Sequence, residues 1–233
     1  MTDIILSCDA LTVRLANKNL IEDVCFSLNR GETAGILGKK GSGKTSLLKA
    51  ISGLLVPFSG SVRIADAPIS PTVLSQIAFL PEESHLPKDM TSSELVGLFS
   101  RMFDDFDAER AASLLRELRV NTEKKFSALS RKTQDKIRLI LTMSRRVSLY
   151  LLDEPFDNGD EAARNYALNM IRTQKREDSA VLLATERIAD AEELLDSFFF
   201  FSEGRLARSG SVSRIKEESG LSLEEYLKGE APC

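Results

Sequence analysis

The stretch Gly38-Lys39-Lys40-Gly41-Ser42-Gly43-Lys44-Thr45 has a glycine, four residues and then Gly-Lys-Thr. This spacing predicts a loop that holds phosphate groups. Glycine lets backbone N–H groups close around a phosphate, where a side chain would hold the backbone away. The lysine supplies a positive charge to the phosphates, and the threonine hydroxyl is suited to ligate Mg²⁺.

The residues on both sides of this loop support the same interpretation. Thr33 to Leu37 has the composition of a buried strand, and Ser46 to Ile51 that of a helix. The positive end of the helix dipole would then lie at the phosphates. We therefore predict a strand, a phosphate-binding loop and a helix in succession. The alternative, a glycine-rich turn with a lysine present by chance, requires neither the strand nor the helix.

The composition is that of an ordinary globular protein. The 233 residues suit one large domain, and 42% are hydrophobic and 28% charged. The net charge of −4 gives no basic excess, so no nucleic-acid partner is expected. The cysteines, Cys8, Cys25 and Cys233, are few and lack metal-binding spacing, which favours a reducing compartment.

No targeting or membrane segment is expected. The N-terminus carries Asp3 and no basic segment before an apolar run, so it does not resemble a secretory signal. No apolar run approaches the ~18–20 residues that a membrane span needs. The apolar cluster Phe198 to Phe201 is bounded by polar residues and predicts a buried strand. Any action at a membrane would therefore need a partner.

Apolar patterning divides the chain into strands, a helical insert and further strands. Strands are predicted at Ile4 to Leu11, Ile21 to Leu28, Gly60 to Ile64, Gln76 to Leu80, Leu149 to Leu152, Val181 to Ala184 and Phe198 to Phe201, with a polar turn at 17–19. Apolar spacing suits amphipathic helices between Thr91 and Arg119 and between Ser127 and Arg146. This order implies an α/β nucleotide domain with a helical lobe. The charged tail from Ser213 to Cys233 predicts one short terminal helix.

The predicted strand at 149–152 is followed directly by two carboxylates, Asp153 and Glu154. At the carboxyl edge of a parallel sheet they would face the phosphate loop. Asp153 could hold Mg²⁺ through water, and Glu154 could orient or deprotonate an attacking water. The alternative is that both merely cap a turn before Pro155.

In the order and spacing of these motifs, nearly the whole chain resembles the ATP-binding cassette (ABC) ATPase family. The matching segments are Gly38 to Thr45 at the Walker A loop, Phe79 to Glu83 at the Q-loop, Leu129 to Thr133 at the signature, Leu149 to Glu154 at Walker B, 157–160 at the D-loop with Asp160 at its aspartate, and Ala184 to Glu186 at the switch loop. Leu80 to Glu83 and Met143 to Arg146 further resemble bacterial exporter ATPases linked to antibiotic, bacteriocin or peptide efflux and immunity.

The resemblance implies a single ABC ATPase domain over 1–233. Its fold would be α/β, a P-loop NTPase (RecA-like) core with an N-terminal antiparallel β subdomain and an α-helical insert. The helical subdomain would cover about 84–146, and a short C-terminal tail about 213–233. The cofactors would be ATP and Mg²⁺. The partners would be a second ABC ATPase chain, like or unlike, in a head-to-tail dimer, and a separate transmembrane permease. The chain would then be cytoplasmic, on the inner face of the cell membrane.

The resemblance also assigns roles to particular residues. Catalytic roles would fall to Lys44, Glu154 and Glu186, and Mg²⁺ would be held by Thr45, Glu82 and Asp153. The nucleotide would be bound by Leu15, Gly38, Lys39, Lys40, Gly41, Ser42, Gly43, Lys44, Thr45, Ser46, Ser130, Arg131 and Lys132. In the dimer, each ATP would lie between the phosphate loop of one chain and the signature of the other.

The chain departs from the family pattern at the switch loop. The family has a histidine there that contacts the γ-phosphate, and this chain has Glu186. A carboxylate about 4 Å from a phosphate oxygen would be repelled by about 4 kcal/mol at an effective dielectric constant near 20. Glu186 must therefore point away, carry a proton or pair with a cation such as Arg187; otherwise it lowers activity. The only histidine, His85, is expected at the surface.

Four further positions depart from the pattern. The close-approach glycines of the signature are Arg131 and Lys132, whose side chains would resist close approach of the backbone. Leu15 stands where the family has an aromatic residue that stacks on adenine, and Glu82 replaces the Q-loop glutamine.

Three functions are consistent with this sequence. The first is the ATP-hydrolysing subunit of a bacterial exporter. The second is a nucleotide-gated binding module with little hydrolysis, which the residues at 131, 132 and 186 favour. The third is a soluble ABC ATPase that has no membrane partner.

Overall fold

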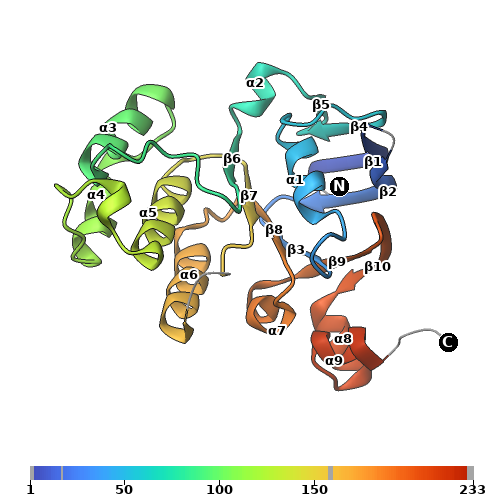
Figure 1. The fold of residues 1–233 in the computed structure, drawn as a ribbon. Helices are drawn as coiled ribbons and strands as arrows, with labels where there is room; N and C mark the ends of the chain where they lie inside the picture. Colours follow the sequence, from blue (N-terminus) through green and yellow to red (C-terminus); the bar gives the residue numbers. More distant parts are fainter. Residues whose placement is uncertain (1–2, 17, 157–159, 230–233) are drawn as a thin grey trace.

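The computed structural model describes residues 3–16, 18–156 and 160–229, which form two sheets and a helical lobe (Figure 1). A four-stranded antiparallel sheet has the order β2-β1-β4-β5. Its strands are β1 (Ile4–Leu15), β2 (Lys18–Asn29), β4 (Ser59–Ile64) and β5 (Ala67–Pro68). The predicted N-terminal β segments are thus present, and β1 extends to Leu15.

The second sheet has six strands in the order β10-β9-β3-β8-β7-β6. Its strands are β3 (Thr33–Leu37), β6 (Ile77–Leu80), β7 (Leu149–Asp153), β8 (Ala180–Thr185), β9 (Ser197–Ser202) and β10 (Arg205–Ser211). All neighbours pair in parallel except β10, which is antiparallel to β9. The chain is therefore an α/β protein with the predicted nucleotide-binding sheet.

The side chains of β7 alternate between two hydrophobic cores, one on each face of this sheet. Leu149 and Leu151 pack in the core that contains α1 (Lys44–Ile51) and the N-terminal strands. Tyr150 and Leu152 pack in the core that contains α5 (Arg131–Met143) and α6 (Glu161–Gln174). Burial on both faces explains why β3, β7 and β8 are continuous apolar runs.

The remaining helices lie in connections between strands and at the C-terminus. They are α2 (Pro71–Leu74), α3 (Ser92–Met102), α4 (Ala108–Glu117), α7 (Ile188–Ala191), α8 (Val212–Ser219) and α9 (Leu223–Gly229), with 3₁₀ turns at Phe126–Ala128 and Glu192–Leu194. Figure 1 shows the green helices α3 and α4 on the side of the molecule opposite the blue strands β1 and β2. The tail forms two helices up to Gly229, so the prediction of one terminal helix is wrong; residues 230–233 lie outside the described part.

No helix in the described ranges is long and apolar enough to cross a membrane.

We predict that Asp107 stabilises the helical lobe in a pH-dependent way. Its Oδ1 accepts a hydrogen bond from the Arg110 N–H at 3.0 Å, and its Oδ2 accepts one from Arg146 at 2.7 Å. The Arg110 N–H first, and then Arg146, lower the pKa of Asp107. A lowered pKa gives stability that is present above the unfolded-state value and is lost as the pH falls through the folded-state value.

Asp107→Ala should therefore lower the free energy of unfolding by about 1 kcal/mol at neutral pH. The difference from wild type should shrink below about pH 4 in urea titrations. Glu109→Ala, in the exposed first turn of the same helix, serves as the control. Equal effects of the two substitutions would contradict the capping role of Asp107.

Candidate nucleotide site

The loop between β3 and α1 has the backbone shape that its glycines permit. Gly43 has a φ of +108°, and a Cβ at this position would lie 2.8 Å from both the Ile21 Cγ2 and the Leu20 carbonyl oxygen. Gly41 has a φ of +82° and faces open space. Both conformations favour glycine, and at Gly43 the close approach of β2 also excludes a side chain.

The Lys44 side chain is buried and crosses the loop. Its Nζ donates hydrogen bonds to the carbonyl oxygens of Gly38, at 2.8 Å, and Lys39, at 3.2 Å. The same Nζ lies 3.5 Å from the Glu154 Oε1. The lysine therefore connects the loop at the end of β3 with the carboxylate that follows β7.

Thr45 and Asp153 form a candidate Mg²⁺ site. The Thr45 Oγ1 donates a hydrogen bond to the Asp153 Oδ1 at 3.2 Å. The Asp153 Oδ2 is buried and has no hydrogen-bond partner within the described residues. Burial raises the pKa of Asp153, the Thr45 hydrogen bond lowers it, and the charge of Glu82 raises it further. A buried carboxylate oxygen without a partner, beside a hydroxyl and a second carboxylate, fits Mg²⁺, which prefers oxygen ligands.

Glu154 is held by the end of β8. Its backbone has a φ of +45°, and its N–H donates to the Ala184 carbonyl oxygen at 2.9 Å. The Glu186 N–H donates to the Glu154 Oε1 at 3.1 Å. Burial raises the pKa of Glu154, while a hydrogen bond from the Thr185 side chain and the charge of Lys44 lower it. These backbone and side-chain contacts fix the orientation of the Glu154 carboxylate.

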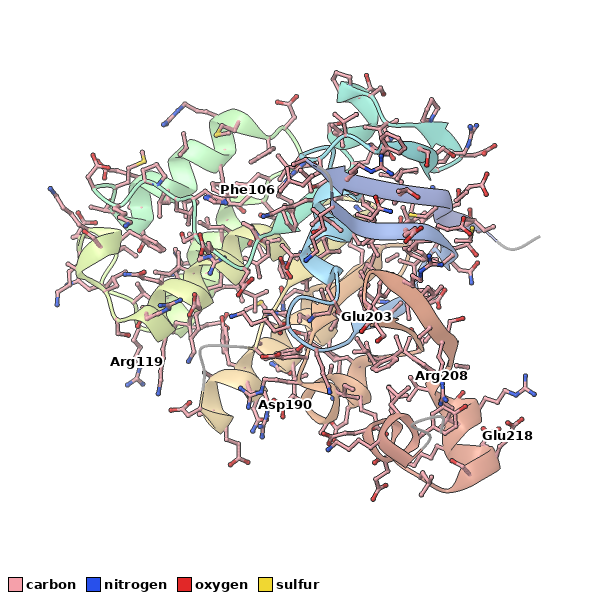
Figure 2. All side chains as sticks on the ribbon, turned by 45° about the vertical axis from the view of Figure 1, so that its right-hand side comes forward. Phe106, Arg119, Asp190, Glu203, Arg208 and Glu218 are labelled. Carbon is pink, nitrogen blue, oxygen red and sulfur yellow. The ribbon has the colours of Figure 1, made fainter. Side chains whose placement is uncertain are left out.

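Lys44, Thr45, Glu154 and Glu186 border a cavity of about 550 Å³, a size typical of small-molecule sites. Its lining comprises Lys18, Asn19, Leu20, Lys40, Gly41, Gly43, Lys44, Thr45, Ser46, Glu82, Glu154, Glu186, Glu203 and Gly204. Figure 2 shows Glu203 beside the blue loop that leads into α1. The Gly204 N–H donates to the Ser42 carbonyl oxygen at 3.0 Å, so the β9–β10 turn supports the loop.

Sequence reasoning missed the contributions of residues 18–20, Glu203 and Gly204. The Glu-Gly pair after the phenylalanine run signals a turn, but nothing in the pattern places that turn at the phosphate loop. The backbone N–H of Glu186 was missed as well, because any residue except proline supplies it.

Several predicted residues lie away from this cavity. Leu15 is 62% exposed and is not part of the described lining. Ser130 caps the amino end of α5 on the helical lobe, where its Oγ accepts a hydrogen bond from the Thr133 N–H.

Lys132 pairs with Asp160 at 2.7 Å, and Asp157, Asn158 and Gly159 of the predicted D-loop lie outside the described residues. Four predicted residues are not in the described lining but hydrogen-bond to residues that are: Gly38, Lys39, Ser42 and Asp153. Arg131 and His85 are exposed.

Of the three arrangements expected for Glu186, pairing with Arg187 is not the one found. The Arg187 Nε lies 2.6 Å from the Asp190 Oδ2, and Arg164 donates to the other oxygen of Asp190 at 2.9 Å. Figure 2 shows Asp190 in the orange segment at α7, apart from Glu203 and the loop. The Glu186 side chain is exposed and lines the cavity, and its backbone N–H donates to the Glu154 carboxylate.

Comparison with known proteins identifies the family. The model of the ABC transporter family matches residues 21–157, more than half of the chain, and the chain belongs to this family. It is 28% identical over 211 residues to the ABC transporter ATP-binding protein YtrB of Bacillus subtilis, covering 89% of this chain and 72% of that protein. The prediction of an ABC ATP-binding subunit is thereby confirmed.

Two further similarities bear on fold and function. A solved structure of an ATP-binding subunit of an ABC transporter matches with a TM-score of 0.86 and 29% identity, covering 96% of this chain and 98% of that one. The chain is also 27% identical over 240 residues to the Nod factor export ATP-binding protein I of Ralstonia nicotianae, covering 98% of this chain and 74% of that protein. The predicted P-loop NTPase fold is confirmed.

We predict that two glycines of the loop differ in their tolerance of alanine. Gly41→Ala should cost only the backbone strain of positive φ, about 1–2 kcal/mol. Gly43→Ala should cost more, because its Cβ would also meet the Leu20 backbone oxygen at 2.8 Å. Urea unfolding of both variants measures the difference, and an equal loss would contradict the close approach of β2 to Gly43.

Proposed function

We propose that this chain is the ATP-binding and ATP-hydrolysing subunit of a bacterial ABC exporter, working through a separate membrane subunit. The convergence of Lys44, Thr45, Asp153 and Glu154 at one sheet edge supports ATP hydrolysis. Export is supported by the resemblance of Leu80 to Glu83 to exporter ATPases and by the similarity to a Nod factor export protein.

In this proposal, the backbone N–H groups of the loop and Lys44 bind the phosphates. Thr45, Asp153 and Glu82 would hold Mg²⁺, which offsets the phosphate charge and orients the nucleotide. Glu154 accepts a proton from the attacking water, a role that its raised pKa suits. Lys44 must exchange its contact with Glu154 for the phosphates, so nucleotide binding frees that carboxylate.

The proposal includes a second ABC ATPase chain and a membrane subunit. Ser130, Arg131 and Lys132 lie on the helical lobe and are not among the described residues that line this chain's own cavity. A head-to-tail dimer, of like or unlike chains, would bring them to the nucleotide of the partner. The membrane subunit would hold the dimer at the cytoplasmic face of the cell membrane.

A second candidate is a nucleotide-gated module with little hydrolysis. The observation that favours it is the exposed carboxylate of Glu186 in the cavity lining. ATP binding without turnover would then drive dimerisation or a conformational change.

Glu154→Gln tests the hydrolytic role. Glutamine keeps the size of the side chain but cannot accept a proton at neutral pH, so turnover should fall on the order of 10²–10⁴-fold while ATP binding remains. Phosphate release and calorimetric ATP binding would be measured side by side, with Glu203→Gln as the control for loss of a cavity carboxylate. Unchanged phosphate release by Glu154→Gln would refute the assignment. Wild-type protein that binds ATP without releasing phosphate would favour the second candidate.

Glu186→His tests whether the switch position limits turnover. Removing a carboxylate near the phosphates relieves repulsion of a few kcal/mol and adds a donor, so phosphate release should rise on the order of tenfold or more. The matched control is Glu203→His, at a second carboxylate of the same cavity. An equal rise in both variants would mean that the overall charge of the cavity, and not contact at position 186, is responsible.

A further inference from the structure

Two buried arginines bind the two ends of β6 from the helical lobe. Arg138, in the middle of α5, binds the carboxyl end of the strand. Arg145, just beyond the end of α5, binds the amino end. The two side chains are 9% and 7% exposed. Both donate to backbone carbonyl groups of the segment that they bind.

Arg138 holds the backbone at Pro81 and Glu82. Its Nη2 donates to the Pro81 carbonyl oxygen and, at 3.2 Å, to the Glu82 carbonyl oxygen. Its Nη1 donates to the Asp135 Oδ1 at 3.0 Å, which fixes the guanidinium from its own helix. A planar guanidinium that bridges two consecutive carbonyls fixes the direction of the peptide between them.

The segment held by Arg138 reaches the nucleotide site. The Glu82 side chain lines the 550 Å³ cavity beside Lys44 and Thr45. Arg138 itself lines a second, small cavity of about 40 Å³ together with Asp153 and Glu154. The arginine thus contacts the backbone of one candidate Mg²⁺ residue and adjoins another, although it belongs to the helical insert.

Arg145 also binds backbone carbonyl groups, but at the amino end of β6, where the contacted residues do not line the nucleotide cavity. It donates to the Ile77 carbonyl oxygen at 2.7 Å, to the Ser75 carbonyl oxygen at 2.8 Å and to both oxygens of Asp105. Its guanidinium also lies 3.9 Å from the centre of the Phe103 ring. None of these described partners lines the nucleotide cavity, so Arg145 offers a matched control.

We propose that Arg138 is a positioning residue that sets Glu82 against the Mg²⁺–nucleotide site and so couples that site to the helical lobe. This inference rests on the proposed nucleotide-binding function. It requires the effect of Arg138 on the nucleotide to pass through Glu82, whereas a purely structural arginine would affect stability alone.

The test measures the affinity of the full chain for a non-hydrolysable ATP analogue by calorimetry, once in excess Mg²⁺ and once in EDTA. The ratio of the two affinities is the Mg²⁺ coupling. Arg138→Met should lower this ratio on the order of tenfold, as expected for loss of an outer-shell partner of a metal ligand. Arg145→Met should lower the thermal midpoint but leave the ratio unchanged. Arg138→Lys should give an intermediate ratio, because an ammonium lacks the planar guanidinium whose Nη1 is fixed by Asp135 while its Nη2 binds the two carbonyls.

The Glu82→Ala background decides whether the effect passes through Glu82. Arg138→Met should have no further effect on the ratio there, and the same loss in both backgrounds would overturn the inference. If Arg138→Met fails to fold, Arg138→Lys takes its place in this comparison, and a wild-type ratio for Arg138→Lys would also overturn the inference. Wild-type protein without affinity for the analogue refutes the proposed function instead. If the wild type shows Mg²⁺ coupling and Arg138→Met leaves it unchanged, only the role of Arg138 is refuted.

Discussion

The site depends on the parallel register of β3, β7 and β8. In this register Leu37 lies opposite Thr185, and Asp153 lies opposite Ala184. The loop after β3, the carboxylates at the end of β7 and the Glu186 N–H therefore meet at one edge of the sheet. A slip of β7 by one residue would exchange the side chains that face the two hydrophobic cores and would remove Asp153 from Thr45. The apolar packing and the chemical geometry are thus specified by the same pairing.

Sequence patterns predicted the elements whose burial is nearly complete. The predicted strand from Thr33 to Leu37 is present with the same bounds, because all five of its residues are buried. The helix α6 and the strand β10 were not predicted. The strand β10 has no buried residue, so it carries no strong apolar period. The antiparallel pairing with β9 makes this segment a strand, although its local sequence pattern does not predict one.

Some residues of the candidate site could likewise be predicted from the sequence, and others could not. The loop and the Walker B carboxylates have a local signature, and their positions follow from one strand end each. Glu203 reaches the cavity only because β9 pairs beside β3, and Arg138 reaches Pro81 only because α5 packs against β6. A lone arginine in an amphipathic helix predicts a solvent-facing position, and its burial against carbonyl groups has no sequence signal. Contacts between segments distant in the chain are therefore where sequence reasoning stops.

The charge of the cavity gives the divalent cation a larger role than the loop alone would suggest. The described lining holds four carboxylates, Glu82, Glu154, Glu186 and Glu203, against three lysines. A free nucleotide polyanion would meet a net negative lining, whereas a Mg²⁺ complex carries less negative charge. The pairing of Lys44 with Glu154 neutralises part of this lining in the resting chain. In the proposed function Lys44 would turn to the phosphates, and the contacts of Glu154 with the Glu186 N–H and Thr185 would then hold its carboxylate in place. Because a backbone N–H supplies one of these contacts, a glutamate at position 186 preserves the orientation of Glu154 while it changes the charge that the phosphates meet.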